Sequence, residues 1–195
     1  MGSYEQKIVQ YLEEAHATEM ALVRVLQSQM AMTPAGSTQS AIEEHLEETR
    51  GHAERVRARI TALGSQTRGN PLQAWVGLTE AVVGQALALG KAPLDMVRGT
   101  SVPEKVLKNA KDDCATEALE IATYTAIEHL ASAHGDDKTA ELAADIIADE
   151  RRMLTRLLDE EIPKLTDAVA AAETGGRAAP TRRSGGSRRT AATSS

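Results

Sequence analysis

Aromatic side chains are almost missing from this sequence. Phe is absent, and one Trp and three Tyr make up the 2% aromatic content of the 195 residues. A core without Phe must be built from Leu, Ile, Val, Ala and Met. These residues pack well between helices and poorly specify a β-sandwich. The composition therefore favours an all-α fold, in a chain long enough to bury well over half of its unfolded surface.

Cysteines and long apolar runs are scarce too. The single Cys114 excludes a disulfide within the chain and favours a reducing compartment. No apolar run approaches the roughly 20 residues that a membrane span needs. The first residues also lack a basic stretch ahead of an apolar one, so we see no secretory signal. We therefore expect a cytoplasmic protein without a membrane span.

Acidic residues are missing from the last stretch, residues 175–195, which carries five arginines. Because the whole chain has a net charge of −6, about −11 falls on the rest. The tail contains only Gly, Ser, Thr, Ala, Pro and Arg, which predicts a disordered segment after a folded domain of residues 1–174. Its arginines could contact nucleic-acid phosphates or an acidic partner. A solubilising role is favoured, because the acidic body would repel DNA.

Four long stretches have the apolar periodicity of amphipathic helices. Short breaks follow the first and the third stretch, at residues 33–37 and 135–137. Helices joined by such short loops are antiparallel neighbours, so the pattern predicts a four-helix bundle built from two hairpins. The predicted helices cover residues 4–32, 38–63, 103–134 and 138–161.

Other breaks in the pattern set the remaining boundaries. Gly64 stands at the usual position just after a helix end, and Pro163 predicts a kink before a last stretch to residue 173. Residues 65–102 form a long crossover between the hairpins, with an apolar segment at residues 72–89. That segment either covers one side of the bundle or lies on a membrane surface. Its lack of basic residues favours the first alternative.

Carboxylates interrupt the apolar stripes of these helices. At about 100° per residue, Glu19 lies in the middle of the stripe of the first helix, and Glu150 occupies a similar position on the fourth. On the third helix, Glu120 shares a face with Tyr124, one turn after Glu117. Tyr124 would either hydrogen-bond a ligand carboxylate or be an ordinary core residue.

The second helix offers a carboxylate and two imidazoles. Glu48 lies at the edge of the apolar stripe, and its face also carries His45 and His52. We take His52 as the candidate ligand and leave His45 out. Each helix thus supplies a carboxylate to or near the buried seam.

An ionised carboxylate that is buried alone must be paired, protonated or metal-bound. No Lys or Arg shares the helix face of Glu19. Two divalent cations would balance four carboxylates, and carboxylates with one or two imidazoles suit iron or manganese. The alternative is that some of these glutamates face solvent.

The segments around these residues resemble the YciF-like branch of the ferritin-like superfamily. The resemblance covers most of residues 5–170 and implies a ferritin-like four-helix bundle, a dinuclear metal centre and a stress-linked bacterial protein. We also expect iron or manganese as the metal, and a homo-oligomer. The matching segments are Ala17-Thr18-Glu19, His45-Leu46-Glu47-Glu48-Thr49-Arg50-Gly51-His52, Glu117-Ala118-Leu119-Glu120-Ile121-Ala122 and Asp149-Glu150-Arg151. The ligands that the resemblance implies are Glu19, Glu48, His52, Glu117, Glu120 and Glu150.

Two departures from the family pattern weaken the expected second metal site. Related second helices place His three residues after Glu, where Gly51 stands here, and His52 comes four residues after Glu48. Related fourth helices often add a second ligand where this chain has Met153 and Leu154.

Three functions remain open at this stage. One is a metal-dependent oxidoreductase that acts on peroxide, dioxygen or ferrous iron. The second is a non-enzymatic binding or scaffold protein with a structural metal or none, and the third is an iron-storage subunit.

Overall fold

The protein is described by a computed structural model that covers residues 3–66 and 101–175. Every element in these two ranges is helical. A π-helical turn, η2, joins α5 directly to α6. The helices are α1 (Ser3–Met32), α2 (Ser37–Gln66), α4 (Val102–Ala133), α5 (Asp137–Arg156), η2 (Leu157–Glu161) and α6 (Ile162–Gly175).

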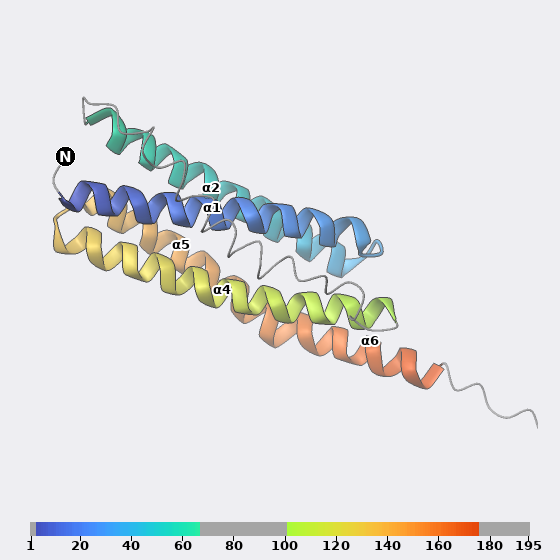
Figure 1. Ribbon diagram of the computed structural model, residues 1–195. Helices are drawn as coiled ribbons and strands as arrows, with labels where there is room; N and C mark the ends of the chain where they lie inside the picture. The colour runs from blue at the N-terminus through green and yellow to red at the C-terminus, as the bar shows by residue number, and fades with distance from the viewer. Residues whose placement is uncertain (1–2, 67–100, 176–195) are drawn as a thin grey trace, which may run out of the picture.

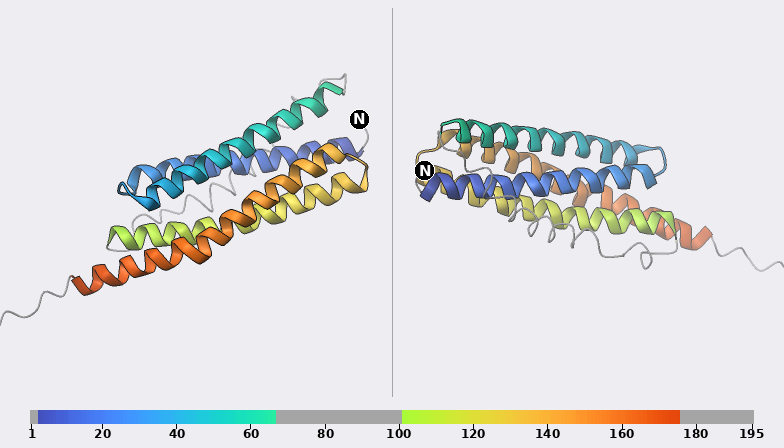
Figure 2. Two further views of the ribbon diagram at one scale, coloured as in Figure 1. Left: turned by 180° about the vertical axis from the view of Figure 1, so that it is seen from behind. Right: turned by 45° about the horizontal axis from the view of Figure 1, so that its top comes forward.

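The helices form two antiparallel hairpins that lie side by side (Figures 1 and 2). One hairpin pairs α1 with α2, and the other pairs α4 with α5, as the short loops predict. The hairpins meet through contacts of α1 with α4 and of α2 with α5. This arrangement confirms the predicted all-α, ferritin-like four-helix bundle.

The turn between α4 and α5 lies beside the start of α1 (Figure 1). Tyr4 stacks on His134 with 4.0 Å between ring centroids, and its hydroxyl donates to Asp136 at 3.3 Å. Asp136 also caps α5, because its side chain accepts the amide hydrogen of Thr139 at 3.1 Å. Gly135 has a φ of 70°, a left-handed conformation that favours glycine. The predicted turn is therefore confirmed.

The predicted end of the second helix is wrong. Gly64 lies inside α2, which continues to Gln66, and Gly64 is not among the residues with positive φ. Glycine can also adopt the helical conformation, at a modest entropic cost.

The sequence predicts a kink at Pro163, and the structure instead has a π-helical turn just before this residue. Its missing amide hydrogen and its ring disfavour a regular α-helix around it. The chain responds with the π-turn η2, in which the Ile162 amide bonds to the carbonyl of Leu157, five residues earlier. Leu157, Glu161 and Leu165 follow at intervals of four residues and are all buried.

Most of the predicted crossover and almost all of the predicted tail lie outside the described residues. None of the described helices is long and apolar enough to cross a membrane.

The apolar core of the bundle is divided by polar side chains. One cluster, around Leu12, Ile127 and Ile146, fills the end near the α4–α5 turn. A second cluster contains Leu22, Leu26 and Leu46, and a third joins α4 to α6. Between them lies a layer of buried carboxylates and imidazoles, which we call the polar layer. Its members are Glu19, His45, His52, Glu117, Glu120 and Glu150.

The division of α4 into a buried and an exposed face can be tested on two aliphatic residues. Ile127 is fully buried in the first cluster, whereas Leu119 is 49% exposed. Replacing Ile127 by Ala should lower the free energy of unfolding by about 2–5 kcal/mol, because it removes buried methyl groups and leaves a cavity. The matched Leu119→Ala change should stay within about 0.5 kcal/mol. Equal losses in urea unfolding of the two variants would contradict the assigned face of α4.

Candidate metal centre

The polar layer draws side chains from all four helices of the bundle. Glu19 comes from α1, and the two histidines come from α2. The carboxylates of Glu117 and Glu120 come from α4, and Glu150 comes from α5. All six side chains belong to residues that are at most 4% exposed. The helical stripes therefore carry these groups into the interior, and the solvent-facing alternative is wrong for the four glutamates of the layer.

The first half of the layer contains Glu19, His52 and Glu150. One ligand atom from each lies within 4.8 Å of the others. His52 Nδ1 is 2.7 Å from Glu150 Oε1 and 3.7 Å from Glu19 Oε1. The Tyr124 hydroxyl donates to Glu19 Oε1 at 2.6 Å, which holds that carboxylate in place from α4. Tyr124 therefore fits both predictions, since it hydrogen-bonds Glu19 and is also a buried residue of the apolar core.

The second half contains Glu117, Glu120 and Glu150, again with ligand atoms within 4.8 Å of one another. His45 Nε2 lies 2.9 Å from Glu117 Oε1 and extends this half. Glu150 belongs to both groups. Its carboxylate therefore joins the two halves.

Several buried atoms in the layer converge without forming hydrogen bonds of ordinary geometry. Among the described residues, none offers such a bond to Glu19 Oε2 or to either carboxylate oxygen of Glu120. His45 Nε2 and His52 Nδ1 lie 2.9 Å and 2.7 Å from the oxygens of Glu117 and Glu150, but these contacts lack the angles of a hydrogen bond. Leaving a buried polar atom unsatisfied costs about 1–3 kcal/mol, and more for a charged group. These oxygen and nitrogen atoms are the donors that a metal ion takes, and their convergence means that the layer could hold one.

The carboxylates are difficult to ionise without a positive partner. Burial raises the pKa of Glu19 to about 7, and raises the pKa of Glu117 to about 12 with help from the neighbouring Glu150. Burial and the charges of Glu19 and Glu150 raise the pKa of Glu120 well above its ordinary value. In the metal-free protein, both shifts favour the protonated forms of Glu117 and Glu120. A metal ion would have to displace these protons.

The two histidines differ in charge. Burial lowers the pKa of His45 to about 4, so its imidazole is neutral and its lone pair is available. Burial also opposes the charge on His52, but the adjacent carboxylates of Glu150 and Glu19 outweigh it and raise the pKa of His52. The pKa of Glu150 is lowered because the neighbouring His52 and Glu117 outweigh its burial.

Asp149 supports His52 from outside the layer. Its Oδ2 lies 3.2 Å from His52 Nε2, the ring nitrogen that faces away from Glu150. Arg55 and Arg152 donate to the Asp149 carboxylate at 3.0 Å and 2.8 Å. Burial would raise the pKa of Asp149, but these contacts lower it. An ionised Asp149 fixes the ring orientation of His52, as partners of metal-bound histidines commonly do.

Comparison with known proteins identifies the family. The model of the family described as "Domain of unknown function (DUF892)" matches residues 3–171. The chain belongs to the DUF892 family. No curated protein gives a significant match.

Solved structures similar to this DUF892 chain come from three bacteria. A Xanthomonas campestris pv. campestris protein is 20% identical with a TM-score of 0.64, over 90% of this chain and 100% of that one. The Escherichia coli stress protein YciF is 20% identical with a TM-score of 0.57, over 89% of this chain and 99% of its own. YcfI from Rhodopseudomonas palustris is 19% identical with a TM-score of 0.58, over 80% and 94% of the two chains. These similarities show that the chain has the YciF-like, ferritin-like helical fold.

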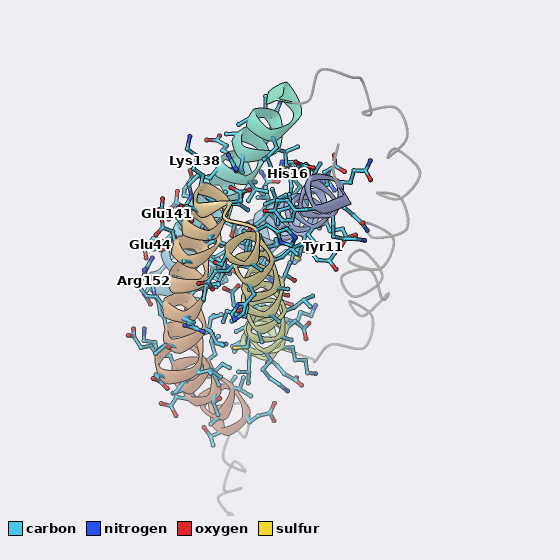
Figure 3. All side chains as sticks on the ribbon, turned by 90° about the vertical axis from the view of Figure 1, so that its left-hand side faces the viewer. Tyr11, His16, Glu44, Lys138, Glu141 and Arg152 are labelled. Carbon is cyan, nitrogen blue, oxygen red and sulfur yellow. The ribbon has the colours of Figure 1, made fainter. Side chains whose placement is uncertain are left out.

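Five of the six sequence-predicted ligands meet in the polar layer of this DUF892 chain, and Glu48 does not. Glu48 is half-buried at the outer edge of α2, where it accepts from Arg152 at 2.5 Å. Figure 3 shows Arg152 and Glu44 along the same outer edge of the bundle. Glu48 can approach His52 only together with Asp149, on the outer side of the imidazole. It is therefore placed to support the layer rather than to enter it.

His45 takes the inward position that the sequence prediction left unassigned. It precedes His52 by seven residues, which is close to two helical turns, so both imidazoles project from one face of α2. This spacing was the signal in the sequence that could have identified His45.

On α5, the side chain of Met153 is buried in the bundle, and that of Leu154 is not. Met153 is 6% exposed and follows Glu150 by three residues, whereas Leu154 is only half-buried. A thioether thus stands on the buried face where related chains often carry a second ligand, and His45 brings a nitrogen atom to the second half from α2.

The raised pKa values predict how pH affects the metal-free protein. A buried carboxyl whose folded pKa exceeds its ordinary value of 4.5 stabilises the fold fully below that value, and this stability is lost as pH rises towards the folded pKa. The melting temperature of chelator-treated protein should therefore fall between about pH 5 and pH 8. Each such group contributes up to about 1.4 kcal/mol per pH unit.

Replacing Glu120 by Gln tests whether buried carboxyls cause this pH dependence, since the amide resembles the protonated carboxyl in shape. The variant should show a flatter dependence of melting temperature on pH. Glu141→Gln, at an exposed position on α5 (Figure 3), is the matched control and should keep the wild-type slope. Identical slopes in all three proteins would show that Glu120 is ionised in the metal-free fold.

Proposed function

We propose that the polar layer binds a pair of iron or manganese ions. Glu19 and His52 would serve one ion, and His45 and Glu117 the other. Glu150 would be shared, because its carboxylate belongs to both groups of converging atoms. The observation that carries this proposal is the convergence of buried oxygen and nitrogen atoms that form no hydrogen bonds of ordinary geometry among the described residues.

Glu120 is the second shared ligand in this proposal. It belongs to the second half of the layer, while the charge of Glu19 in the first half also raises its pKa. Its carboxylate therefore lies within electrostatic reach of both halves. Neither of its oxygen atoms has a hydrogen-bond partner among the described side chains.

Charge and donor type both favour this pair of ions. The four carboxylates of the layer, once deprotonated, carry the negative charge that two divalent cations neutralise. Oxygen donors combined with two imidazoles suit iron or manganese, whereas zinc and copper sites more often use thiolates or several imidazoles. With His45 included, each ion has one nitrogen ligand, so the weak second site expected from Met153 and Leu154 no longer follows from a missing nitrogen.

The activity that we infer is peroxide reduction. A pair of iron or manganese ions supplies redox chemistry and a place for two oxygen atoms to bind. The chain itself supplies the environment for proton transfer. The Tyr124 hydroxyl donates to Glu19 Oε1 at 2.6 Å, so it would hold this ligand carboxylate in place and bring an O–H group to the edge of the centre. The description of the E. coli relative as a stress protein agrees with a role against peroxide.

Two substitutions on α2 test whether His45, and not Glu48, is a metal ligand. His45→Ala should reduce bound iron or manganese from about two equivalents to about one, since it removes the only imidazole of the second half among the described residues. Glu48→Gln should leave the metal content unchanged, because Glu48 pairs with Arg152 at the surface. Elemental analysis after reconstitution measures both. Metal loss in Glu48→Gln with full retention in His45→Ala would reverse the assignment.

Peroxide turnover is tested on the metal-loaded protein. Addition of hydrogen peroxide with a reductant should change the ultraviolet-visible spectrum and consume peroxide, and the metal-free protein should do neither. Glu120→Gln should abolish consumption, whereas Glu141→Gln should retain it. Bound metal without peroxide consumption would leave storage or a structural metal as the function. Absence of transition metal after reconstitution would remove the centre itself.

A further inference from the structure

A cavity of about 480 Å³, including the part open to solvent, lies beside the polar layer. Residues from α1, α2, α4, α5, η2 and α6 line it, so it occupies the place where the two hairpins and the π-turn meet. Of the polar layer, only His45 lines this cavity. The cavity therefore adjoins the half that contains His45 and Glu117, and not the half that contains His52.

Two buried carboxylates face this space. Asp113 on α4 is 4% exposed and accepts a hydrogen bond from the Gln29 amide of α1 at 2.9 Å. Glu161 on η2 is 5% exposed, and its Oε1 accepts from Lys164 at 3.0 Å. The other oxygen, Glu161 Oε2, is buried and has no hydrogen-bond partner among the described residues. An acidic group with an unsatisfied oxygen at a cavity wall is suited to a cation.

Among the described residues, two positive groups near the cavity are paired with carboxylates. Arg156 lines the cavity, but its guanidinium donates to Glu44 on α2 at 2.5 Å. Lys164 is largely exposed and bonds to Glu161 from the solvent side. The lining of the cavity includes polar side chains such as Gln29 and Asp113 and apolar ones such as Ala110.

We propose that this cavity is the route by which divalent metal ions enter the centre, with Glu161 and Asp113 as transient ligands before His45. The proposal rests on the metal centre proposed above and adds the path by which ions reach it. An ion would exchange water for carboxylate oxygens in the cavity and then pass to the imidazole at its inner wall. Acidic groups at the entrance raise the local concentration of cations and so accelerate loading.

The rate of loading tests this route separately from the existence of the centre. Cobalt(II) serves as the probe, because its visible absorption reports coordination in stopped-flow mixing with metal-free protein. Glu161→Gln should slow the rise of absorption by on the order of tenfold, with an unchanged final amplitude. Ala110→Leu should also slow it, because the larger side chain narrows the cavity without changing its charge.

The control is Glu160→Gln, the neighbouring residue on the same π-turn. Glu160 is exposed, so this change removes the same charge without altering the cavity, and loading should proceed at the wild-type rate. Wild-type rates in both Glu161→Gln and Ala110→Leu would overturn the route. A lower final amplitude in Glu161→Gln would also overturn it, because Glu161 would then be a permanent ligand. Failure of the wild-type protein to bind cobalt would instead count against the proposed metal centre.

Discussion

The structure depends on the cost of removing carboxylates from water. Four glutamates from three helices are placed where a bundle of this size would normally carry leucines. Taking an ionised carboxylate out of water costs several kcal/mol even after relaxation, so the fold must hold these groups protonated, pair them or bind a cation. In the metal-free protein, the raised pKa values of Glu117 and Glu120 favour the first solution, and Glu150 lies 2.7 Å from His52, which favours the second. A pair of divalent ions would satisfy all four carboxylates at once. The strain of the polar layer and its affinity for metal therefore have the same physical origin.

Much of this layer was predictable from helical periodicity. Glu19 and Glu150 each lie in the middle of an apolar stripe, and their burial follows from the rest of the stripe. On α2, the seven-residue spacing of His45 and His52 indicates a shared face, but Glu48 lies at the edge of the apolar stripe and its place could not be settled from the pattern. In the structure Arg152 of α5 pairs with Glu48 at the outer edge of α2, and His45 takes the inward position. The sequence contains no local signal of that contact over a separation of 104 residues.

The helix ends, too, were only partly predictable from the sequence. The turn at Gly135 follows from local chemistry and was predicted, whereas the continuation of α2 through Gly64 reflects the helical tolerance of an exposed glycine. Pro163 predicted a disturbance, but its form depends on which backbone hydrogen bonds remain. The π-turn keeps the chain helical and keeps Glu161 turned towards the interior. Local insertions of this kind are frequent at functional sites in helical proteins.

The division of the apolar core has a consequence for the way the protein unfolds. The cluster around Ile127 and the cluster around Leu26 are each held by contacts of their own, and the polar layer lies between them. Contiguous apolar packing is what makes distant parts of a domain open together, and regions joined by weaker contacts open as separate cooperative units. We therefore expect the end of the bundle near the α4–α5 turn and the end near the α1–α2 turn to open as two such units in the metal-free chain. Ligands drawn from both sides of the layer would fuse them into one, so that a single binding event would change the cooperativity of the whole domain as well as its stability.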